Sequence, residues 1–216
     1  MKITKLIHSC LLVEMPDPVN RTALFDPGIM SEAAVQVDTL QYLDDIIITH
    51  NHADHMSVPL IKKLKDKFPE VRITATAEAA RDLLEEGIEA LTEETPGIVF
   101  FKSPHEDVSP LAEQPEQNGI NYLNLLTHPG DSHSFGSTLP VLALPVTAPW
   151  GSTIRAVNLA ISLGPKYIIP IHDWHWSEEA RKQTYDRLSK FFKNNGIEFL
   201  QPETGVPIVL DVKPQT

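Results

Sequence analysis

The feature that most constrains this chain is a short apolar run that leads directly into a cluster of histidines. The run Asp45–Thr49 (DIIIT) is β-branched and almost entirely apolar, which predicts a strand buried on both faces. The segment HNHADH follows at residues 50–55. His50 therefore lies where a rigid strand ends. His50 and His52 are two residues apart, so in an extended segment their imidazoles point to the same side.

The residue types in this cluster indicate metal binding. Asp54 and His55 belong to the turn that follows the strand and would face a second centre close to that of His50 and His52. Neutral imidazole and carboxylate are good ligands for zinc and other borderline divalent metals. Packing alone seldom brings so many candidate ligands into one short segment. The competing interpretation is a surface cluster of histidines with no ion.

Length and composition favour one ordinary globular domain. The chain has 216 residues, of which 42% are hydrophobic and 22% charged, and single domains usually hold about 100–200 residues. Neither a repeat nor a long linker divides it. We therefore predict a single domain over residues 1–216.

The charge and the cysteine content exclude several classes of partner and compartment. A net charge of −11 disfavours nucleic acid, whose binding depends on Lys and Arg contacts to phosphate. The one cysteine, Cys10, allows no internal disulfide. No secretory leader and no apolar run of membrane-spanning length are visible. We expect a cytoplasmic protein with no membrane partner, and a homo-oligomer stays open.

Patterning predicts strands that dominate the first part and alternate with helices in the rest, as in α/β folds. Strands are expected at residues 1–7, 10–15, 22–25, 45–49, 71–76, 98–102, 120–126, 141–146 and 166–171, and a loop at 104–119. Helices are expected after an N-cap at Ser57, at 78–86, at 152–163 and at about 177–194. The first helix should bury Leu60, Ile61, Leu64 and Phe68, and the last one Leu188, Phe191 and Phe192.

HNHADH resembles the HxHxDH signature of the metallo-β-lactamase fold hydrolases. Four further segments are similar to a short branch of that family that includes the ascorbate-6-phosphate lactonase-like metal-dependent hydrolases. These are LIHSCLLVE, TALFDP, HPGDS and YIIPIH, in that order along the chain. The resemblance runs nearly from end to end. It implies an α/β fold of the metallo-β-lactamase type, a four-layer αββα sandwich.

The resemblance also implies two divalent metal ions, with zinc expected and manganese or iron compatible with the same ligands. One ion would take His50, His52 and a third histidine. The other would take Asp54, His55 and His172, with Asp131 bridging both. These assignments, carried over from the family motif, are expectations for this chain.

The third histidine has two candidates. His105, in KSPHED, follows a strand at the start of the long loop, where this branch places its ligand. His128, in THPGDS, also resembles a ligand motif of other family members. We favour His105, in which case His128 lies near the pocket without binding an ion.

Four more residues have two interpretations each. His8 is either a core histidine or a neighbour of the metals, and Asp26 is either a turn residue or an acceptor for the N–H of a ligand histidine. Trp150 stands before a helix N-terminus that would attract an anionic substrate group, or it covers core. His175 either belongs to a loop or touches substrate. His133 is expected on the surface, and Trp174 and Trp176 in the core.

The implied activity is hydrolysis of a small ester, lactone or phosphoester by a hydroxide that bridges the two metals. A two-metal site lowers the pKa of a bound water to near 7. Asp54 would orient the nucleophile and carry a proton to the leaving group. No Ser or Cys nucleophile is needed.

Three alternatives remain open. A phosphodiesterase or RNA-processing nuclease of the same fold would usually add basic modules, which this acidic chain lacks. An iron-dependent oxidoreductase would usually carry Glu in place of His52. A metal-stabilised binding protein without catalysis is the third alternative, and only an assay separates it from an enzyme.

Overall fold

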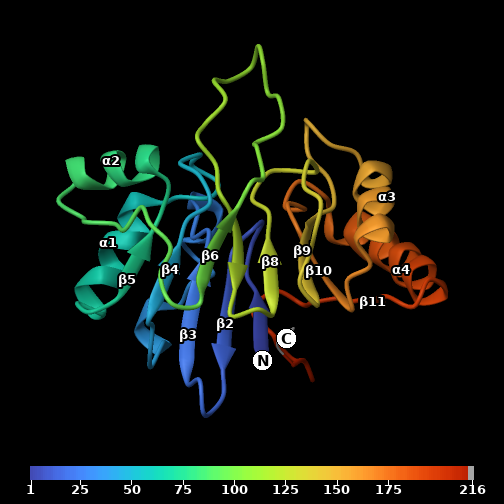
Figure 1. Cartoon of the computed structure of the whole chain (residues 1–216), viewed down its shortest axis with the longest axis horizontal. Helices are drawn as coiled ribbons and strands as arrows, with labels where there is room; N and C mark the ends of the chain where they lie inside the picture. Colours follow the sequence, from blue (N-terminus) through green and yellow to red (C-terminus); the bar gives the residue numbers. More distant parts are fainter. Residues whose placement is uncertain (214–216) are drawn as a thin grey trace. The chain divides into compact units, whose positions relative to one another are not determined.

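A computed structural model describes residues 1–213, and the chain divides into two compact units. The first unit comprises Met1–Glu93, Pro115–Asn118 and Glu203–Asp211, and the second comprises Glu94–Gln114, Gly119–Pro202 and the residues from Val212. Each unit holds one six-stranded sheet and two α-helices among the described residues (Figure 1). The expectation of a single domain stays a prediction.

The sheet of the first unit has the strand order β12-β1-β2-β3-β4-β5. Its strands are β1 (Lys2–Lys5), β2 (Leu11–Met15), β3 (Arg21–Phe25), β4 (Asp45–Ile47), β5 (Arg72–Thr74) and β12 (Pro207–Val209). β12, β1, β2 and β3 pair antiparallel, whereas β3, β4 and β5 run parallel. The carboxyl ends of these three parallel strands therefore lie at one edge of the sheet, and their amino ends lie at the opposite edge.

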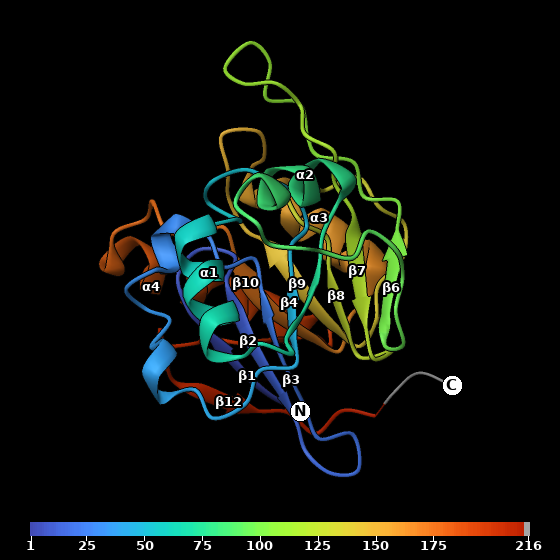
Figure 2. The ribbon, with the colours of Figure 1, turned by 90° about the vertical axis from the view of Figure 1, so that its left-hand side faces the viewer.

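Helices α1 (Val58–Lys67) and α2 (Ala77–Glu85) pack on one face of this sheet (Figure 2). The predicted N-cap is confirmed, because Ser57 Oγ accepts a hydrogen bond from the Leu60 N–H at 3.3 Å. Leu60, Ile61 and Leu64 are buried, and Phe68 is partly buried against them. The apolar stripe read from the sequence is therefore the face of α1 that covers the core.

The sheet of the second unit has the order β11-β10-β9-β8-β7-β6. Its strands are β6 (Ile98–Phe101), β7 (Gly119–Tyr122), β8 (Leu126–His128), β9 (Val141–Pro145), β10 (Tyr167–Ile171) and β11 (Glu198–Phe199). β6, β7 and β8 pair antiparallel, and β8 to β11 run parallel. Helices α3 (Thr153–Leu163) and α4 (Glu178–Asn194) pack with β9, β10 and β11 around a second core.

Two predictions about the strands and helices of this unit are wrong. The single strand expected at 120–126 is a hairpin, because Leu123 and Asn124 have φ angles of 53° and 54° and reverse the chain between β7 and β8. Phe191 of α4 is 45% exposed, whereas Leu188 and Phe192 are buried as expected. Phe192 stacks on Phe199 of β11 and fills the core position.

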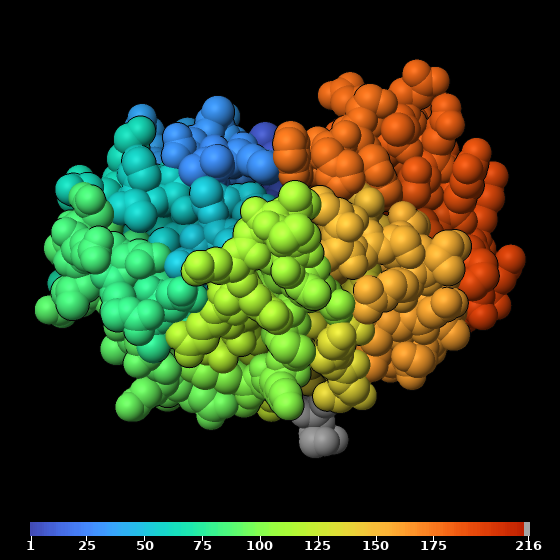
Figure 3. Space-filling view, turned by 90° about the horizontal axis from the view of Figure 1, so that it is seen from above, coloured from blue at the N-terminus to red at the C-terminus, as the bar shows by residue number. Residues whose placement is uncertain are grey.

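The segment 104–118 is a loop, as predicted, and extends beyond the end of β6 (Figure 1). Seen from above, the side chains of this loop lie at the surface, coloured light green (Figure 3). Leu111 is 86% exposed. Within residues 1–213, no helix has both the length and the apolar character needed to cross a bilayer.

Candidate metal centre

The residues expected at the site follow strand ends, and three of them have unusual backbone geometry. His8, Asp26 and His172 have φ angles of 62°, 42° and 62°. Non-glycine residues in this left-handed region cost of order 1–3 kcal/mol each, and such residues concentrate at functional sites. Asp26 directly follows β3, and His172 directly follows β10. The backbone is therefore strained at positions where chemistry was expected.

In the first unit, the carboxylate of Asp26 organises the segment that carries the HNHADH histidines. Its Oδ1 accepts from the Thr49 N–H, and its Oδ2 accepts from the Thr49 hydroxyl and lies 2.8 Å from His55 Nδ1. Asp26 is fully buried. Because an ionised carboxylate only accepts hydrogen bonds, the His55 proton is on Nδ1, and Nε2 carries the lone pair. This geometry supports the interpretation of Asp26 as an acceptor for a histidine N–H rather than as a turn residue alone.

His50 is oriented through the same carboxylate. Its Nδ1 lies 3.1 Å from Thr49 Oγ1, whose own proton is directed at Asp26. The hydroxyl oxygen therefore accepts from His50 Nδ1, and Nε2 again carries the lone pair. The ring of His50 lies 4.8 Å from that of His52 and 4.1 Å from that of His55, between centroids. The strand end thus gathers three imidazoles.

His8 and Asp54 belong to this group. His8 Nε2 lies 3.0 Å from Asp54 Oδ2, and His55 Nε2 lies 3.9 Å from the same oxygen. The rings of His8 and His55 are 5.4 Å apart in an edge-to-face arrangement. His8 is therefore a neighbour of the HNHADH segment rather than a histidine isolated in the core.

A close backbone contact fixes the position of this segment. Gly28 is so near the turn that a Cβ atom built on it would lie 1.8 Å from the Asp54 carbonyl oxygen. The Ile29 N–H bonds the Ala53 carbonyl, and the Ser57 N–H bonds the Pro27 carbonyl. Only a residue without a side chain fits between the two segments. The FDPG sequence after β3 thus supports the HNHADH turn sterically as well as through Asp26.

In the second unit, Asp131 lies against two imidazoles and an indole. Its Oδ2 is 2.9 Å from His172 Nε2 and 3.7 Å from His105 Nε2, and it accepts from Trp150 Nε1 at 3.2 Å. His172 Nδ1 lies 2.8 Å from the Thr147 carbonyl oxygen, and His105 Nδ1 lies 2.6 Å from that of Glu106. A carbonyl oxygen only accepts, so both Nδ1 atoms carry protons, and Nε2 is the nitrogen of each ring that faces Asp131.

This donor set fits a bound cation. A carboxylate oxygen close to two imidazole lone pairs is electrostatically unfavourable unless a positive charge, from a metal or added protons, lies among them. Holding Nδ1 on an oxygen acceptor while Nε2 binds the ion is the usual arrangement of metal-binding histidines. His50, His55, His105 and His172 all hold Nδ1 on an oxygen in this way.

His128 follows the opposite arrangement. Its Nδ1 accepts a hydrogen bond from the Gly130 N–H at 3.3 Å, so its proton is on Nε2. It is fully buried at the end of β8. The hydrogen bonding therefore distinguishes His128 from the four histidines that hold Nδ1 against an oxygen acceptor.

The surface position expected for His133 is wrong, since this residue is buried. Its Nε2 lies 2.7 Å from the Pro145 carbonyl oxygen, and its ring packs edge to face on Trp150 at 5.2 Å between centroids. Burial lowers the pKa of His133. Gly151 makes this packing possible, because a Cβ there would lie 2.9 Å from the imidazole. His133 thus packs against the Trp150 indole and holds it in position.

His175 is exposed, and its Nε2 lies 3.4 Å from Thr147 Oγ1. Desolvation lowers the pKa of His175, and the nearby His172 lowers it further. Trp174, expected in the core, is 50% exposed, and Trp176 is only partly buried. The segment after His172 is therefore more open than the sequence suggested.

Glu106 is a site residue that the sequence did not reveal. Its carboxylate accepts from the His133 N–H, the Ser134 hydroxyl and Arg155 Nη2, at 2.9, 2.7 and 3.1 Å. Its own N–H bonds the Asp131 carbonyl. Partial burial favours its neutral form, but these hydrogen bonds and the Arg155 charge outweigh burial and lower its pKa. Its partners lie far apart in sequence, so no local motif could have marked it.

Asp173, next to His172, is also held by a distant residue. Its carboxylate accepts from the buried Tyr185 hydroxyl of α4. Burial, followed by the negative charge of Asp173, raises the pKa of Tyr185. The hydroxyl therefore stays a donor and fixes the segment that begins at His172.

Comparison with known proteins identifies the class. Residues 2–172 match the model of the Beta-lactamase superfamily domain. The chain is 32% identical over 205 residues to Protein Rv0786c of Mycobacterium tuberculosis, with 88% of this chain and 92% of that protein covered.

Solved structures of two other proteins have a similar fold. The metallo hydrolase Igni18 of Ignicoccus hospitalis superposes with a TM-score of 0.72 at 18% identity, over 98% of this chain and 99% of that one. The metallo-β-lactamase fold protein YhfI of Bacillus subtilis gives 0.64 at 16%, over 96% and 98%. The chain belongs to the Beta-lactamase superfamily, and the predicted α/β fold of the metallo-β-lactamase type is confirmed.

Proposed function

We propose that this chain is a binuclear metal-dependent hydrolase that acts on a small ester, lactone or phosphoester. The observation that carries the proposal is the shared orientation of His50, His55, His105 and His172. Each holds Nδ1 on an oxygen acceptor, which leaves Nε2 as the nitrogen that binds a metal. Structural packing alone does not require four histidines to share one tautomer.

The ligand assignment follows the family motif. One ion would be held by His50, His52 and His105, and the other by Asp54, His55 and His172, with Asp131 between them. Zinc suits this set, and manganese or iron would bind the same residues. His105 is preferred to His128 because His105 Nε2 faces Asp131 at 3.7 Å, whereas His128 Nδ1 accepts from Gly130.

When bound, the two ions would supply Lewis acidity and a water acidic enough to ionise near neutral pH. The protein side chains would bind and orient these ions and move protons. Asp131 offsets part of the positive charge, and Asp26 keeps His55 and, through Thr49, His50 in the required tautomers. Asp54, whose Oδ2 lies near His8 and His55, would accept a proton from the attacking water and return it to the leaving group.

The substrate is proposed to be a small molecule rather than nucleic acid, because the chain carries a net charge of −11. Trp150 and His175 are the proposed substrate contacts in the second unit. The Trp150 indole is anchored to Asp131 at 3.2 Å, which would give a substrate a flat and rigid wall. We expect the chain to act in the cytoplasm, as its single Cys10 suggests.

A panel of lactones, phosphomonoesters and phosphodiesters, assayed with measured metal content, tests this function. His52→Ala and Asp131→Ala should each lose at least one ion and nearly all hydrolysis. Asp186→Ala, an exposed carboxylate on α4, is the matched control and should keep both. Full hydrolysis by either ligand variant with its metal missing would contradict the proposal. Preference for phosphodiesters would favour the nuclease alternative, and a visible iron band the oxidoreductase.

A further inference from the structure

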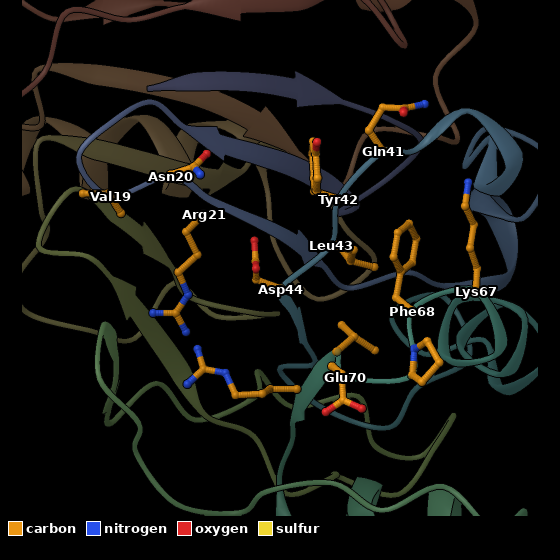
Figure 4. Close-up of a pocket in the computed structure, with 13 residues that line it drawn as sticks. Val19, Asn20, Arg21, Gln41, Tyr42, Leu43, Asp44, Lys67, Phe68 and Glu70 are labelled. Carbon is orange, nitrogen blue, oxygen red and sulfur yellow. The ribbon is translucent and has the colours of Figure 1, made fainter.

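A cavity with charged and aromatic walls lies in the first unit, at the opposite edge of its sheet from Asp26 and His50. It has a volume of about 560 Å³ (Figure 4). Arg21, Asp45 and Arg72 are the first residues of β3, β4 and β5. Because these strands are parallel and Asp45 pairs with both Ala23 and Arg72, their amino ends bring the three charged side chains together.

Two guanidinium groups share one carboxylate at this edge. Asp45 is fully buried and accepts from Arg21 Nε and Nη2 at 2.5 and 2.8 Å, and from Arg72 Nη2 at 2.7 Å. One carboxylate balances only one of the two positive charges. Burial raises the pKa of Asp45 to about 6, against the attraction of Arg21. Asp45 therefore leaves one positive charge of this pair unbalanced, and protonation of Asp45 in acid would leave both.

Arg72 has donors left for a ligand. Its side chain is 37% exposed, and within residues 1–213 its only hydrogen-bond acceptor is Asp45 Oδ1. Its Nε and Nη1 therefore have no protein acceptor in that part of the chain. A guanidinium offers paired donors whose geometry matches a carboxylate. Arg21, whose Nε and Nη2 are occupied by Asp45, fixes the position of the pair.

The opposite wall is flat and apolar. Tyr42 and Phe68 stand across the cavity from Arg21 (Figure 4), and Leu43 and Pro69 also line it. Tyr42 is 76% exposed, which is unusual for a large aromatic side chain. Aromatic faces pack favourably on planar apolar groups. The wall thus suits a ligand with a ring.

The remaining charges limit how negative the ligand can be. Lys67 donates to the carbonyl oxygens of Val37, Asp38 and Leu40, so its ammonium is already engaged. Asp44 lies between Arg21 and the aromatic wall (Figure 4), and Glu70 also lines the cavity. Two acidic side chains repel a polyanion such as phosphate more than they repel a monoanion.

We propose that this cavity binds a small aromatic monocarboxylate, with the carboxylate on Arg72 and the ring against Tyr42 and Phe68. The site is separate from the metal-binding residues and does not depend on the hydrolase activity proposed above. Such a ligand would stabilise the amino ends of the same parallel strands whose carboxyl ends carry Asp26 and His50.

Calorimetric titration of the full chain with benzoate tests the proposal. We expect benzoate to bind saturably, inorganic phosphate to bind more weakly, and benzylamine not to bind. Arg72→Gln should weaken benzoate by at least about tenfold, as expected for loss of a charge-assisted pair. Arg81→Gln, on α2, is the matched control and should bind normally. His52→Ala should also bind normally, which separates this site from the proposed function.

Three results would overturn it. These are no saturable benzoate binding, unchanged binding by Arg72→Gln, and phosphate or benzylamine binding as tightly as benzoate. If Arg72→Gln fails to fold, Tyr42→Ala decides, because this exposed side chain makes no ion pair. Loss of benzoate binding in a folded Tyr42→Ala supports the site, and normal binding contradicts it.

Discussion

The central physical feature at the level of side chains is the orientation of imidazoles by oxygen acceptors at Nδ1. Asp26 reaches His55 directly and His50 through the Thr49 hydroxyl. Carbonyl oxygens of Glu106 and Thr147 do the same for His105 and His172. A neutral imidazole that donates through Nδ1 presents only Nε2 to an ion, which makes the ligand set preorganised.

Replacement of Asp26 by Ala is expected to weaken metal binding without removing any ligand. His55 would lose the acceptor for Nδ1–H and Thr49 the acceptor for its hydroxyl, so both tautomers would be less well fixed. Loss of such a partner typically costs about 10–100-fold in metal affinity. Competition with a chromophoric chelator measures the change. An affinity equal to that of the unmodified chain would show that Asp26 is only a turn residue.

The two candidate histidines give a paired prediction. His105→Ala should lower the number of ions per chain, because its Nε2 is directed at Asp131. His128→Ala should keep both ions and change only turnover or substrate preference. Elemental analysis of the two variants, side by side, settles the assignment. The reverse pattern would exchange the roles of the two residues.

The sequence revealed most of these side chains, but not the contacts among them. HNHADH is a local pattern, so its ligands could be read directly. Thr49, Glu106 and Tyr185 act through partners distant in sequence or through hydroxyl orientation, which no local pattern records. His133 was placed on the surface because nothing in THPGDSH shows that the Pro145 carbonyl oxygen receives its ring.

Among the secondary-structure elements, the connection between β3 and the metal-binding turn is the most sterically constrained. Gly28→Ala would put a Cβ atom 1.8 Å from the Asp54 carbonyl oxygen, an atom of the backbone that cannot rotate away. Overpacking of this kind costs about 1–3 kcal/mol. Urea unfolding should show that loss together with weaker metal binding.

Gly136→Ala is the matched control for this change. A Cβ at Gly136 meets no heavy atom within 4 Å, so its unfolding free energy should stay close to that of the unmodified chain. If both glycine variants are equally stable and bind metal equally well, the close contact does not fix the turn.

Glu106 links the segment after β6 to the turn that carries Asp131, and its pKa makes this link sensitive to pH. A pKa lowered in the folded state contributes stability above the ordinary glutamate value of 4.5, and that contribution is lost as the pH falls through the folded value. Glu106→Gln should therefore be less stable than the unmodified chain at pH 7, and the difference should shrink in acid.

Urea unfolding at neutral pH and near pH 4 measures this difference. Glu85→Gln, an exposed residue at the end of α2, serves as the control and should show no such trend. If Glu106→Gln lowered the unfolding free energy equally at both pH values, the negative charge of Glu106 would not be what stabilises the contact between these two segments.

Most strands and all four α-helices were predicted within a few residues, because their signals are local. The N-cap predicted at Ser57 is confirmed, and in α3 Ser152 caps the start and the left-handed Gly164 ends the helix. The hairpin between β7 and β8 was missed because Leu123 and Asn124 reverse the chain without a glycine or proline. β11 is only two residues long, too short for a periodic pattern.

For the chain as a whole, the order of motifs was more informative than composition. Length and hydropathy indicated only an ordinary globular protein, and they did not reveal the division into two compact units. The metal-binding signature, in contrast, identified the superfamily that the comparisons confirm. The proposed metal ligands do not encode the substrate, because a metal-bound water would be activated in the same way whatever bond is attacked.

The number of metal ions per chain tests the central claim most directly. The purified protein is saturated with zinc, desalted and analysed for zinc and protein, alongside Asp131→Ala and the Asp186→Ala control. We predict about two ions per chain for the unmodified protein and the control, and at most one for Asp131→Ala. A binuclear centre would be contradicted if the unmodified protein bound less than one zinc ion per chain and both variants bound the same amount.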